Sequence, residues 1–428
     1  MLFPKFAGIF IENIKKYMKP LNLKISTWFA LLIGLFLIEK VNAQKPKLCK
    51  KEPINFNIDK VFQFALNQYT KATTNFTDTT KAIRSCDSTG KWTSINKTDW
   101  MSGFFPGILW YIYENTGDKN IGEQARKWTQ SIEKQKFQIH HHDIGFMMFC
   151  SFGNALRLKP DPRDIPVLMQ SANSAITRYN PKVGTIKSWN FKPNDHPTII
   201  DNMMNLELLT WASRQSKDPI YKDIAIKHAE TSIKHHFRPD YSSYHVVLYD
   251  STTGEVIKRH TAQGFSDDSR WARGQAWGLY GYVMMYRETG KKEFLEQGKK
   301  ISDLFINLLP ADTIPFWDFD APDQPNAVKD ASSAAVAAAG LLELSLLVKN
   351  PAQSRKYYNA GVKLLNALST SKYLADKDQY ECILLHSAYH VPKKYEVDVN
   401  ISYADYYYLE ALARLKKIQN GAKKVAWF

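Results

Sequence analysis

The sequence predicts an all-α fold: an (α/α)6 toroid, or barrel, of six helical hairpins with one small inserted β-hairpin. Three observations carry this prediction: polar breaks recur along the chain, amphipathic helices follow them, and strand-like sequence is sparse. The 428 residues are 44% hydrophobic and 13% aromatic, enough apolar sequence for a large core. Because no Pro/Gly/Ser-rich linker interrupts the sequence, we expect a single domain over residues 44–428.

Five polar breaks divide the chain, and each combines residues that end one helix with residues that start another. They lie at 115–120, 159–164, 216–221, 289–294 and 349–354. The helices expected after them, such as 221–235 and 292–309, repeat apolar residues at three- and four-residue spacing. Intervals of roughly 40 to 75 residues suit one hairpin plus a variable loop, so about six hairpins fit. Closing them into a ring buries the apolar face that each exposes alone, and an open solenoid is the alternative.

The one clear strand signal lies in the middle of the chain. Residues 244–250 read Tyr-His-Val-Val-Leu-Tyr-Asp, a Ser-Thr-Thr-Gly turn follows, and residues 255–258 read Glu-Val-Ile-Lys. β-Branched and aromatic residues on both sides of a turn predict a β-hairpin. We expect this hairpin to be inserted in a loop between helices.

The N-terminus has the features of a signal peptide over residues 1–43. Lysines precede an apolar run at 28–38, and Val41-Asn42-Ala43 forms a small-x-small end, so we expect cleavage after Ala43. The apolar run is shorter than the roughly 20 residues that span a bilayer, which makes a permanent anchor the weaker alternative. We therefore expect an exported, periplasmic protein with no stable membrane span after cleavage.

The chain is strongly basic, with a formal net charge of +15. Residues 1–43 carry six lysines against two glutamates, a net charge of +4, which leaves +11 for the mature chain. An exported protein seldom meets nucleic acid, so we expect an acidic oligosaccharide as the partner of this surface. The expected oligomeric state is a monomer or weak dimer.

The four cysteines, at positions 49, 86, 150 and 382, show no CxxC spacing. This scatter indicates neither a zinc site nor a dense disulfide framework. A single Cys49–Cys86 bridge is the pairing left open.

The first segment that carries chemistry is 99–113, where glycines and a proline shape a loop that enters an apolar helix. Sugar sites combine aromatic rings, which pack on the faces of pyranose rings, with carboxylates, amides and guanidinium groups. Trp100 is the candidate stacking residue of this segment. Trp110 and Tyr113 lie at helical spacing, so we assign them to the core.

The second segment, 140–149, contains three histidines followed by Asp143 and an apolar helix. An aspartate at this position usually caps the helix, and that interpretation competes with a functional one. The histidine triplet is compatible with metal binding, but consecutive residues do not share a helix face and no HxxxH follows. We therefore expect no metal.

The third segment, 197–211, places Asp201 after two isoleucines and before an amphipathic helix. Capping is again the alternative. The apolar neighbours Ile199, Ile200, Met203 and Met204 favour a functional carboxyl instead, because desolvation raises a carboxyl pKa toward the value that a proton donor needs.

The fourth segment, 260–280, alternates Trp271, Arg273, Gln275 and Trp277 at the entrance to a helix. No purely structural role explains this pattern well. An arginine between two tryptophans suits a planar carboxylate held over an aromatic ring.

These segments resemble glycoside hydrolase family 88, the unsaturated glucuronyl hydrolases, from about Trp100 to Leu412. The motifs that carry the resemblance are HHDIGF, IIDNMMNLELL, QGFSDDSRWARGQAW, DASSAA and SYADYYYLEAL. The resemblance implies the toroid, a catalytic domain without a cofactor, Asp201 as general acid and base, and Asp143 as the second essential carboxylate. It also implies a pocket lined by His142, His245, Gln263, Trp271, Arg273 and Trp277, with Trp100 and Trp189 as stacking residues.

The resemblance further implies hydration chemistry on a 4,5-unsaturated uronic acid at the non-reducing end of lyase-made glycosaminoglycan fragments, of chondroitin, hyaluronan or heparin type. Protonation of C4 of this vinyl ether leads to addition of water at C5 and then to cleavage of the glycosidic bond. Lys393 and Lys394 lie where the family has a loop that can approach the second sugar, so sulfate contact and two solvated lysines are both open.

Three rival functions fit parts of the sequence. An unsaturated rhamnogalacturonyl hydrolase would use similar chemistry on pectin fragments. A toroidal sugar epimerase should show catalytic histidines on opposed helices. A non-catalytic glycan-binding protein would not need both Asp143 and Asp201.

Overall fold

A computed structural model describes residues 50–425 of the chain, apart from 87, 88 and 191. These residues belong to one compact unit. The expected signal peptide over 1–43 lies outside the described residues, as does Cys49, the first cysteine of the pairing that the sequence leaves open. The three described cysteines, Cys86, Cys150 and Cys382, are buried and free.

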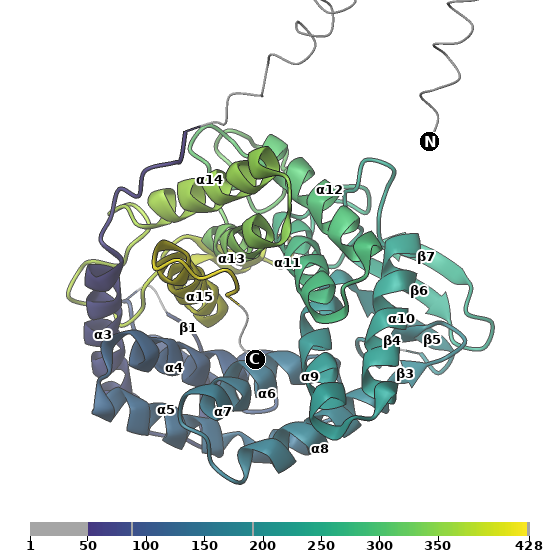
Figure 1. Cartoon of the computed structure of the whole chain (residues 1–428), viewed down its shortest axis with the longest axis horizontal. Helices are drawn as coiled ribbons and strands as arrows, with labels where there is room; N and C mark the ends of the chain where they lie inside the picture. The colour runs from purple at the N-terminus through teal and green to yellow at the C-terminus, as the bar shows by residue number, and fades with distance from the viewer. Residues whose placement is uncertain (1–49, 87–88, 191, 426–428) are drawn as a thin grey trace, which may run out of the picture. The chain divides into compact units, whose positions relative to one another are not determined.

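An inner ring of six helices forms the centre of the described chain (Figure 1). Most are buried on every side: all residues from Ala331 to Ser345 are buried, for example. A helix that is apolar all round belongs in a core. The inner helices are α4 (Phe104–Thr116), α6 (Ile144–Met148) continued by a π turn (Phe149–Gly153) and α7 (Asn154–Leu158), α9 (Leu206–Ser216), α11 (Ala272–Thr289), α13 (Ala331–Leu347) and α15 (Ser402–Gln419).

A second ring of six helices surrounds the first in the described part of the chain. Most of these helices bury one face only, and α14 is buried more fully over residues 357–362. In α12, for example, the buried residues recur at three- and four-residue spacing from Phe294 to Phe305. The outer helices are α3 (Ile58–Asn75), α5 (Lys119–Ser131), α8 (Asp164–Ile176), α10 (Pro219–His235), α12 (Lys292–Leu308) and α14 (Pro351–Leu368).

The ring closes because the last inner helix meets the first. α15 packs against α4 on one side and α13 on the other, and α3 packs on both α4 and α15. The sixth hairpin therefore joins the two ends of the described chain. The predicted (α/α)6 toroid is confirmed, and the open solenoid is excluded.

Each polar break identified in the sequence is the short turn from an inner helix to its outer partner. Two of these turns show how local chemistry fixes them. Gly117 takes a left-handed conformation (φ 73°) at the end of α4, and the Asp118 side chain accepts from the Ile121 N–H to cap α5. Asn350 caps α14 in the same way, ahead of a proline in the first turn.

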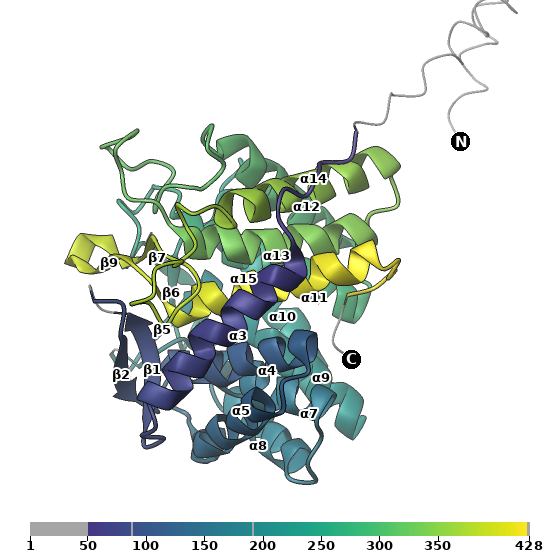
Figure 2. The same cartoon turned by 90° about the vertical axis from the view of Figure 1, so that its left-hand side faces the viewer.

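The longer connections, from outer helices to the next inner helices, carry short antiparallel strands at one end of the ring (Figure 2). The predicted hairpin is present as β6 (Val246–Asp250) and β7 (Val256–His260), and β5 (Asp195–Ile199) adds a third strand to it. The remaining pairs are β1 (Lys81–Cys86) with β2 (Trp92–Asn96), β3 (Tyr179–Asn180) with β4 (Thr185–Ile186), and β8 (Ser387–His390) with β9 (Tyr395–Val399).

The structure therefore contains more strands than the single inserted hairpin that the sequence predicts. The additional strands have two to six residues each, too few to give a recognisable pattern in the sequence.

No membrane-spanning helix is found among the described residues, since none of their helices combines sufficient length with sufficient hydropathy.

Candidate active site

A cavity of about 460 Å³ lies at the strand-bearing end of the ring, where the inner helices begin. Four inner helices start beside it, and their N-terminal ends are positive ends of helix dipoles, which favours an anionic ligand. The lining residues are Thr98, Asp99, Trp100, His141, His142, Asp143, Trp189, Ile199, Asp201, His245, Ala262, Gln263, Arg273, Tyr389 and His390.

Asp201 lies in the 3-10 turn η4 (Ile200–Asn205) that leads into α9. Its side chain is 13% exposed, and its Oδ2 atom has no hydrogen-bond partner among the described residues. Burial raises the pKa of this carboxyl to about 7; the positive charge of Arg273 opposes the shift, and the negative charge of Asp143 adds to it. Near neutral pH, Asp201 can therefore both give and take a proton.

Asp143 occupies the N-cap position of α6, but its side chain makes no capping hydrogen bond. Instead, Oδ2 lies 3.1 Å from Nδ1 of His141, and Oδ1 lies 3.2 Å from Nε2 of His142. Burial acts to raise the pKa of Asp143, but His142, the contact with His141 and the charge of Arg178 outweigh it and lower the pKa. Asp143 is therefore ionised beside Asp201, and the capping interpretation of Asp143 is wrong.

His245 approaches Asp201 from the three-stranded sheet. Its Nδ1 atom accepts from the backbone N–H groups of Ala262 and Gln263, both at 3.2 Å. Burial lowers its pKa well below the usual value, so the ring is neutral with its proton on Nε2, which lies 3.9 Å from Asp201 Oδ2. The ring stacks on Trp271 with centroids 4.3 Å apart. His245 therefore places a hydrogen-bond donor, its Nε2–H group, beside the carboxyl of Asp201.

Arg273 is buried in the first turn of α11, and protein atoms surround its terminal nitrogens. Nη1 donates to the carbonyl of Ala388 (2.5 Å) and lies 3.3 Å from Oδ2 of Asp330. Nη2 donates to the Tyr389 carbonyl (2.9 Å) and to Oε1 of Gln263 (3.1 Å). Arg273 therefore orients Gln263 and strand β8, and its charge acts on the pocket at short range.

Aromatic residues form two groups around the cavity. Trp100, in the 3-10 turn η1 (Trp100–Gly103), and Trp189 line it, as their proposed stacking role requires. Trp271 and Trp277 are buried beside it, and neither belongs to the lining. Trp271 supports His245 from behind, and the charge of Arg273 lies 4.6 Å from its ring. Direct substrate contact by these two tryptophans stays a prediction.

The structure also adds residues that the sequence did not single out. Tyr389 and His390 line the cavity from the end of strand β8, just before the loop that carries Lys393 and Lys394. Lys393 and Lys394 themselves are exposed in and after the turn η5 (Val391–Lys393), outside the lining. His141, which the sequence marks only as a member of a histidine triplet, also lines the cavity. No pattern in the sequence distinguished these residues, because their positions depend on contacts with remote segments.

The histidine triplet does not converge on one point. His140 is exposed, whereas His141 and His142 contact different oxygens of Asp143. Among the described residues, no group of three or more His, Cys, Asp or Glu side chains is placed to hold a metal ion. The site therefore offers two carboxyls of opposite protonation, a neutral histidine donor and aromatic walls. This arrangement suits proton transfer to and from a bound anionic sugar.

Comparison with known proteins gives a family match over most of the folded chain. The family model described as Glycosyl Hydrolase Family 88 matches residues 66–313. An unsaturated glucuronyl hydrolase of Formosa agariphila is 45% identical over 326 residues, which cover 75% of this chain and 80% of that protein. An unsaturated chondroitin disaccharide hydrolase of Streptococcus pyogenes serotype M1 is 34% identical over 332 residues, covering 76% and 83%.

Solved structures agree with the match in sequence. The crystal structure of an unsaturated glucuronyl hydrolase specific for heparin superposes with a TM-score of 0.82 at 42% identity. The superposition covers 86% of this chain and 99% of that one. The likeness therefore includes both the ring and the loops that carry the cavity.

Proposed function

The chain belongs to glycosyl hydrolase family 88 and is a glycosidase, and from this premise we propose that it acts on unsaturated glycosaminoglycan fragments. The bond cleaved is the one that joins a non-reducing-end 4,5-unsaturated glucuronic or hexuronic acid to the next sugar. Polysaccharide lyases generate such ends. Similarity to a heparin-specific enzyme and to a chondroitin disaccharide hydrolase supports this substrate class.

One observation carries the proposal: a buried carboxyl with a raised pKa and an unpaired oxygen faces a cavity of sugar-binding size. Asp201 keeps its proton to about pH 7, so it can protonate a carbon atom. Its Oδ2 atom has no competing partner among the described residues. A purely structural carboxyl at this depth would be hydrogen-bonded.

The proposed reaction begins with proton transfer from Asp201 to C4 of the unsaturated sugar. Positive charge then develops on C5 and the ring oxygen, and Asp201 is left as a carboxylate. A water molecule adds to C5 and returns its proton to Asp201. The C5 hemiketal opens to a ketone, which leaves a hemiacetal at C1 that expels the second sugar as an alcohol.

The remaining residues hold the substrate and its charges in this proposal. The sugar carboxylate lies within reach of the positive helix ends and of the Arg273 charge. His245 offers its Nε2 proton to the carboxylate or to the attacking water, which fits its distance from Asp201. Gln263 binds hydroxyl groups, His142 lines the pocket and orients Asp143, and Trp100 and Trp189 pack on the ring faces.

The deciding experiment follows the loss of ultraviolet absorbance of the conjugated double bond when purified protein meets lyase-made disaccharides. Unsaturated disaccharides from hyaluronan, chondroitin and heparin are compared with unsaturated pectin fragments. Chromatographic release of the second sugar checks that cleavage accompanies hydration. Turnover of pectin fragments alone would favour a rhamnogalacturonyl hydrolase, and binding without absorbance loss would indicate a glycan-binding protein.

Sulfate recognition by Lys393 and Lys394 is a finer part of the proposal. Both side chains are exposed in the β8–β9 loop, which follows the strand that supplies Tyr389 to the cavity. Replacing both with serine should raise KM for sulfated disaccharides a few-fold and leave unsulfated ones unchanged, since an exposed ion pair contributes up to about 1 kcal/mol. Equal effects on both substrates would assign the lysines to the solvated surface.

We also propose export to the periplasm after cleavage at Ala43, and a monomer or weak dimer. The basic, apolar and small-residue regions of residues 1–43 support export. N-terminal sequencing of the protein recovered from a periplasmic fraction, with light scattering of the purified protein, tests these points.

A further inference from the structure

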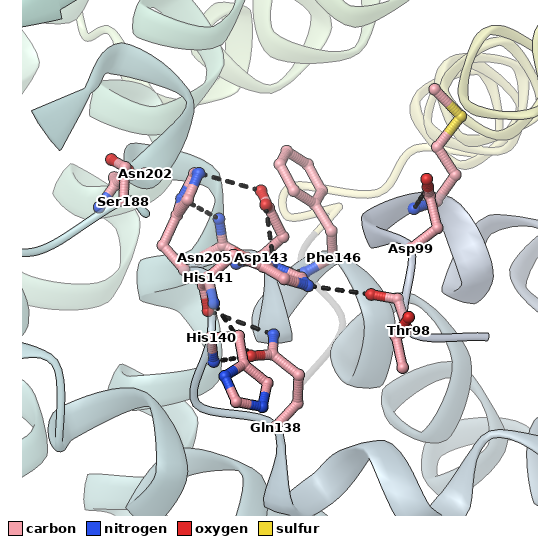
Figure 3. A network of polar contacts seen from close by, with 12 residues as sticks. Thr98, Asp99, Gln138, His140, His141, Asp143, Phe146, Ser188, Asn202 and Asn205 are labelled. Carbon is pink, nitrogen blue, oxygen red and sulfur yellow. Dashed lines mark hydrogen bonds and ion pairs between the residues drawn. The ribbon is translucent and has the colours of Figure 1, made fainter. Parts of the chain in front are cut away.

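His141 lies between a backbone carbonyl and the carboxylate of Asp143 (Figure 3). Its Nε2 atom is 3.0 Å from the carbonyl oxygen of Thr98, and its Nδ1 atom is 3.1 Å from Oδ2 of Asp143. A carbonyl oxygen only accepts, so Nε2 carries a proton. In a neutral ring, Nδ1 would then present a bare lone pair to a carboxylate oxygen.

The neighbouring His142 meets the other oxygen of Asp143 without this conflict. The side-chain amide of Asn205 lies 3.4 Å from Nδ1 of His142, as a donor. Nε2 of His142 therefore carries the single proton of a neutral ring and lies 3.2 Å from Asp143 Oδ1. Burial lowers the pKa of His142 to about 4, in keeping with a neutral ring. Two adjacent histidines thus face one carboxylate in different states.

A second contact competes at Nδ1 of His141. The backbone N–H of Asp143 lies 3.3 Å from it, and this contact needs a bare nitrogen. The contact with the carboxylate is shorter and needs a proton on the same nitrogen. A charge-assisted hydrogen bond is about twice as strong as a neutral one, so the proton on Nδ1 prevails.

We propose that His141 is a positioning residue of the reaction: held as an imidazolium between the Thr98 carbonyl and Asp143, it keeps Asp143 ionised and fixed in orientation. This role rests on the proposed function for its kinetic consequence. It acts on Asp201 through Asp143, whose negative charge raises the pKa of the proton donor.

The backbone around His141 is built to hold this geometry. Oε1 of Gln138 accepts from the N–H of His141, and Nε2 of Gln138 donates to its carbonyl. An isolated β-bridge joins His141 to Trp189, another residue of the cavity wall. The backbone of His141 is therefore fixed on both sides, and its side chain is only 23% exposed.

The charges that face His141 agree with a protonated ring. Burial acts to lower its pKa, but the contacts with Asp143 and Thr98 and the charge of Asp99 outweigh burial and raise the pKa. Asp99 is itself paired with Arg84 at 3.0 Å, and the charge of Arg178 acts on Asp143. Neither arginine is a charge partner of His141 itself.

Nitrogen NMR of the histidine rings tests the protonation state without substrate. His141 should have both ring nitrogens protonated at pH 7 and should titrate above the usual histidine value, with its signals assigned by their loss in H141Q. In D143N, the same ring should titrate at lower pH. A neutral His141 with a bare Nδ1 at pH 7, or a titration unmoved by D143N, overturns the proposal.

Two matched substitutions test the consequence for catalysis. In His141→Asn, the amide nitrogen takes the place of Nδ1 and still donates to Asp143; in His141→Gln, it takes the place of Nε2 and reaches only Thr98. H141Q should lose about tenfold or more in kcat. The acid limb of its pH profile should move to higher pH, because Asp143 loses the partner that lowers its pKa. H141N should recover much of kcat, and His140→Gln, at the exposed neighbour, should match the wild type.

The two experiments separate failure of this role from failure of the proposed function. If the wild type cleaves no unsaturated disaccharide, the proposed function fails, and the NMR titration still decides the state of His141. If the wild type is active but H141N and H141Q are equally impaired with unchanged pH profiles, His141 contributes only to packing and the proposed role is overturned.

Discussion

Two buried aspartates in the same ring of helices have opposite surroundings. Asp201 and Asp405 both lie near the start of an inner helix, and burial raises the pKa of each to about 7. Asp405 accepts four hydrogen bonds, from the Tyr69 hydroxyl (2.8 Å), the N–H groups of Ile383 (2.9 Å) and Leu384 (2.8 Å), and the Asn400 amide (3.0 Å). Oδ2 of Asp201 has no hydrogen-bond partner among the described residues, and Asp201 lines the cavity.

The difference shows what identifies a catalytic carboxyl. A raised pKa is common to both residues, so it cannot separate them. The unpaired oxygen and the cavity do, because a saturated carboxyl has no lone pair free for substrate. Asp405 ties α15 to α3 and to the segment at 383–384, so we assign it to stability.

The largest expected effect is the loss of turnover in Asp201→Asn. The amide keeps the shape of the carboxylic acid but cannot deliver a proton, so kcat should fall by roughly 10³-fold or more. Calorimetric titration with an unsaturated disaccharide should show little change in affinity. Ordinary turnover by the purified variant would remove Asp201 from the mechanism and end its contrast with Asp405.

The same substitution should stabilise the fold in a pH-dependent way. The folded pKa of Asp201 is raised, so the wild type loses stability as pH rises from about 4 to about 7 and no further above that. Asp201→Asn lacks this loss. The free energy of unfolding of the variant should therefore rise relative to that of the wild type over this window, by at most about 4 kcal/mol. Chemical denaturation at several pH values measures it; a constant difference across the window would mean that the folded pKa is not raised.

Asp405→Ala should lower stability and leave turnover nearly unchanged, the reverse of the effects expected for Asp201→Asn. Removing this carboxylate leaves four buried donors without an acceptor, which should cost about 3 kcal/mol or more of unfolding free energy. The fraction that folds should keep nearly the wild-type kcat. Asp201→Ala is the matched control for stability. It deletes a carboxyl of similar burial whose Oδ2 has no hydrogen-bond partner among the described residues, so it should cost less unfolding free energy than Asp405→Ala. A loss of kcat in Asp405→Ala at full folding would show that the two sites are coupled.

Asp143→Asn should lower kcat by about 10²-fold and move the alkaline limb of the pH profile. The negative charge of Asp143 helps to raise the Asp201 pKa, so neutralising it should lower that pKa and shift the alkaline limb to lower pH. Turnover of wild type and variant across pH checks this. An alkaline limb that stays in place would mean that burial alone sets the pKa of Asp201.

Local chemistry explains which parts of the molecule the sequence could predict. Turns such as the one at Gly117 and Asp118 depend on neighbouring residues, so the breaks and the hairpin count followed from the sequence. The roles of Asp143 and Asp201 could not be separated from capping locally, because their surroundings come from other segments. Tyr389 and His390 were missed for the same reason: Arg273, more than a hundred residues earlier, holds their strand beside the cavity.

The smallest expected effect comes from removing one of the four hydrogen bonds to Asp405. Tyr69→Phe removes one of the four donors to Asp405 and keeps the ring that packs against Trp92 and Phe105. Because three donors remain, the cost should be about 1 kcal/mol of unfolding free energy, with kcat and the pH profile unchanged. Denaturant titration and the disaccharide assay together check it. A larger loss of unfolding free energy would mean that Asp405 depends mainly on Tyr69. A changed pH profile of turnover would mean that Asp405 influences catalysis, which its four hydrogen bonds do not indicate.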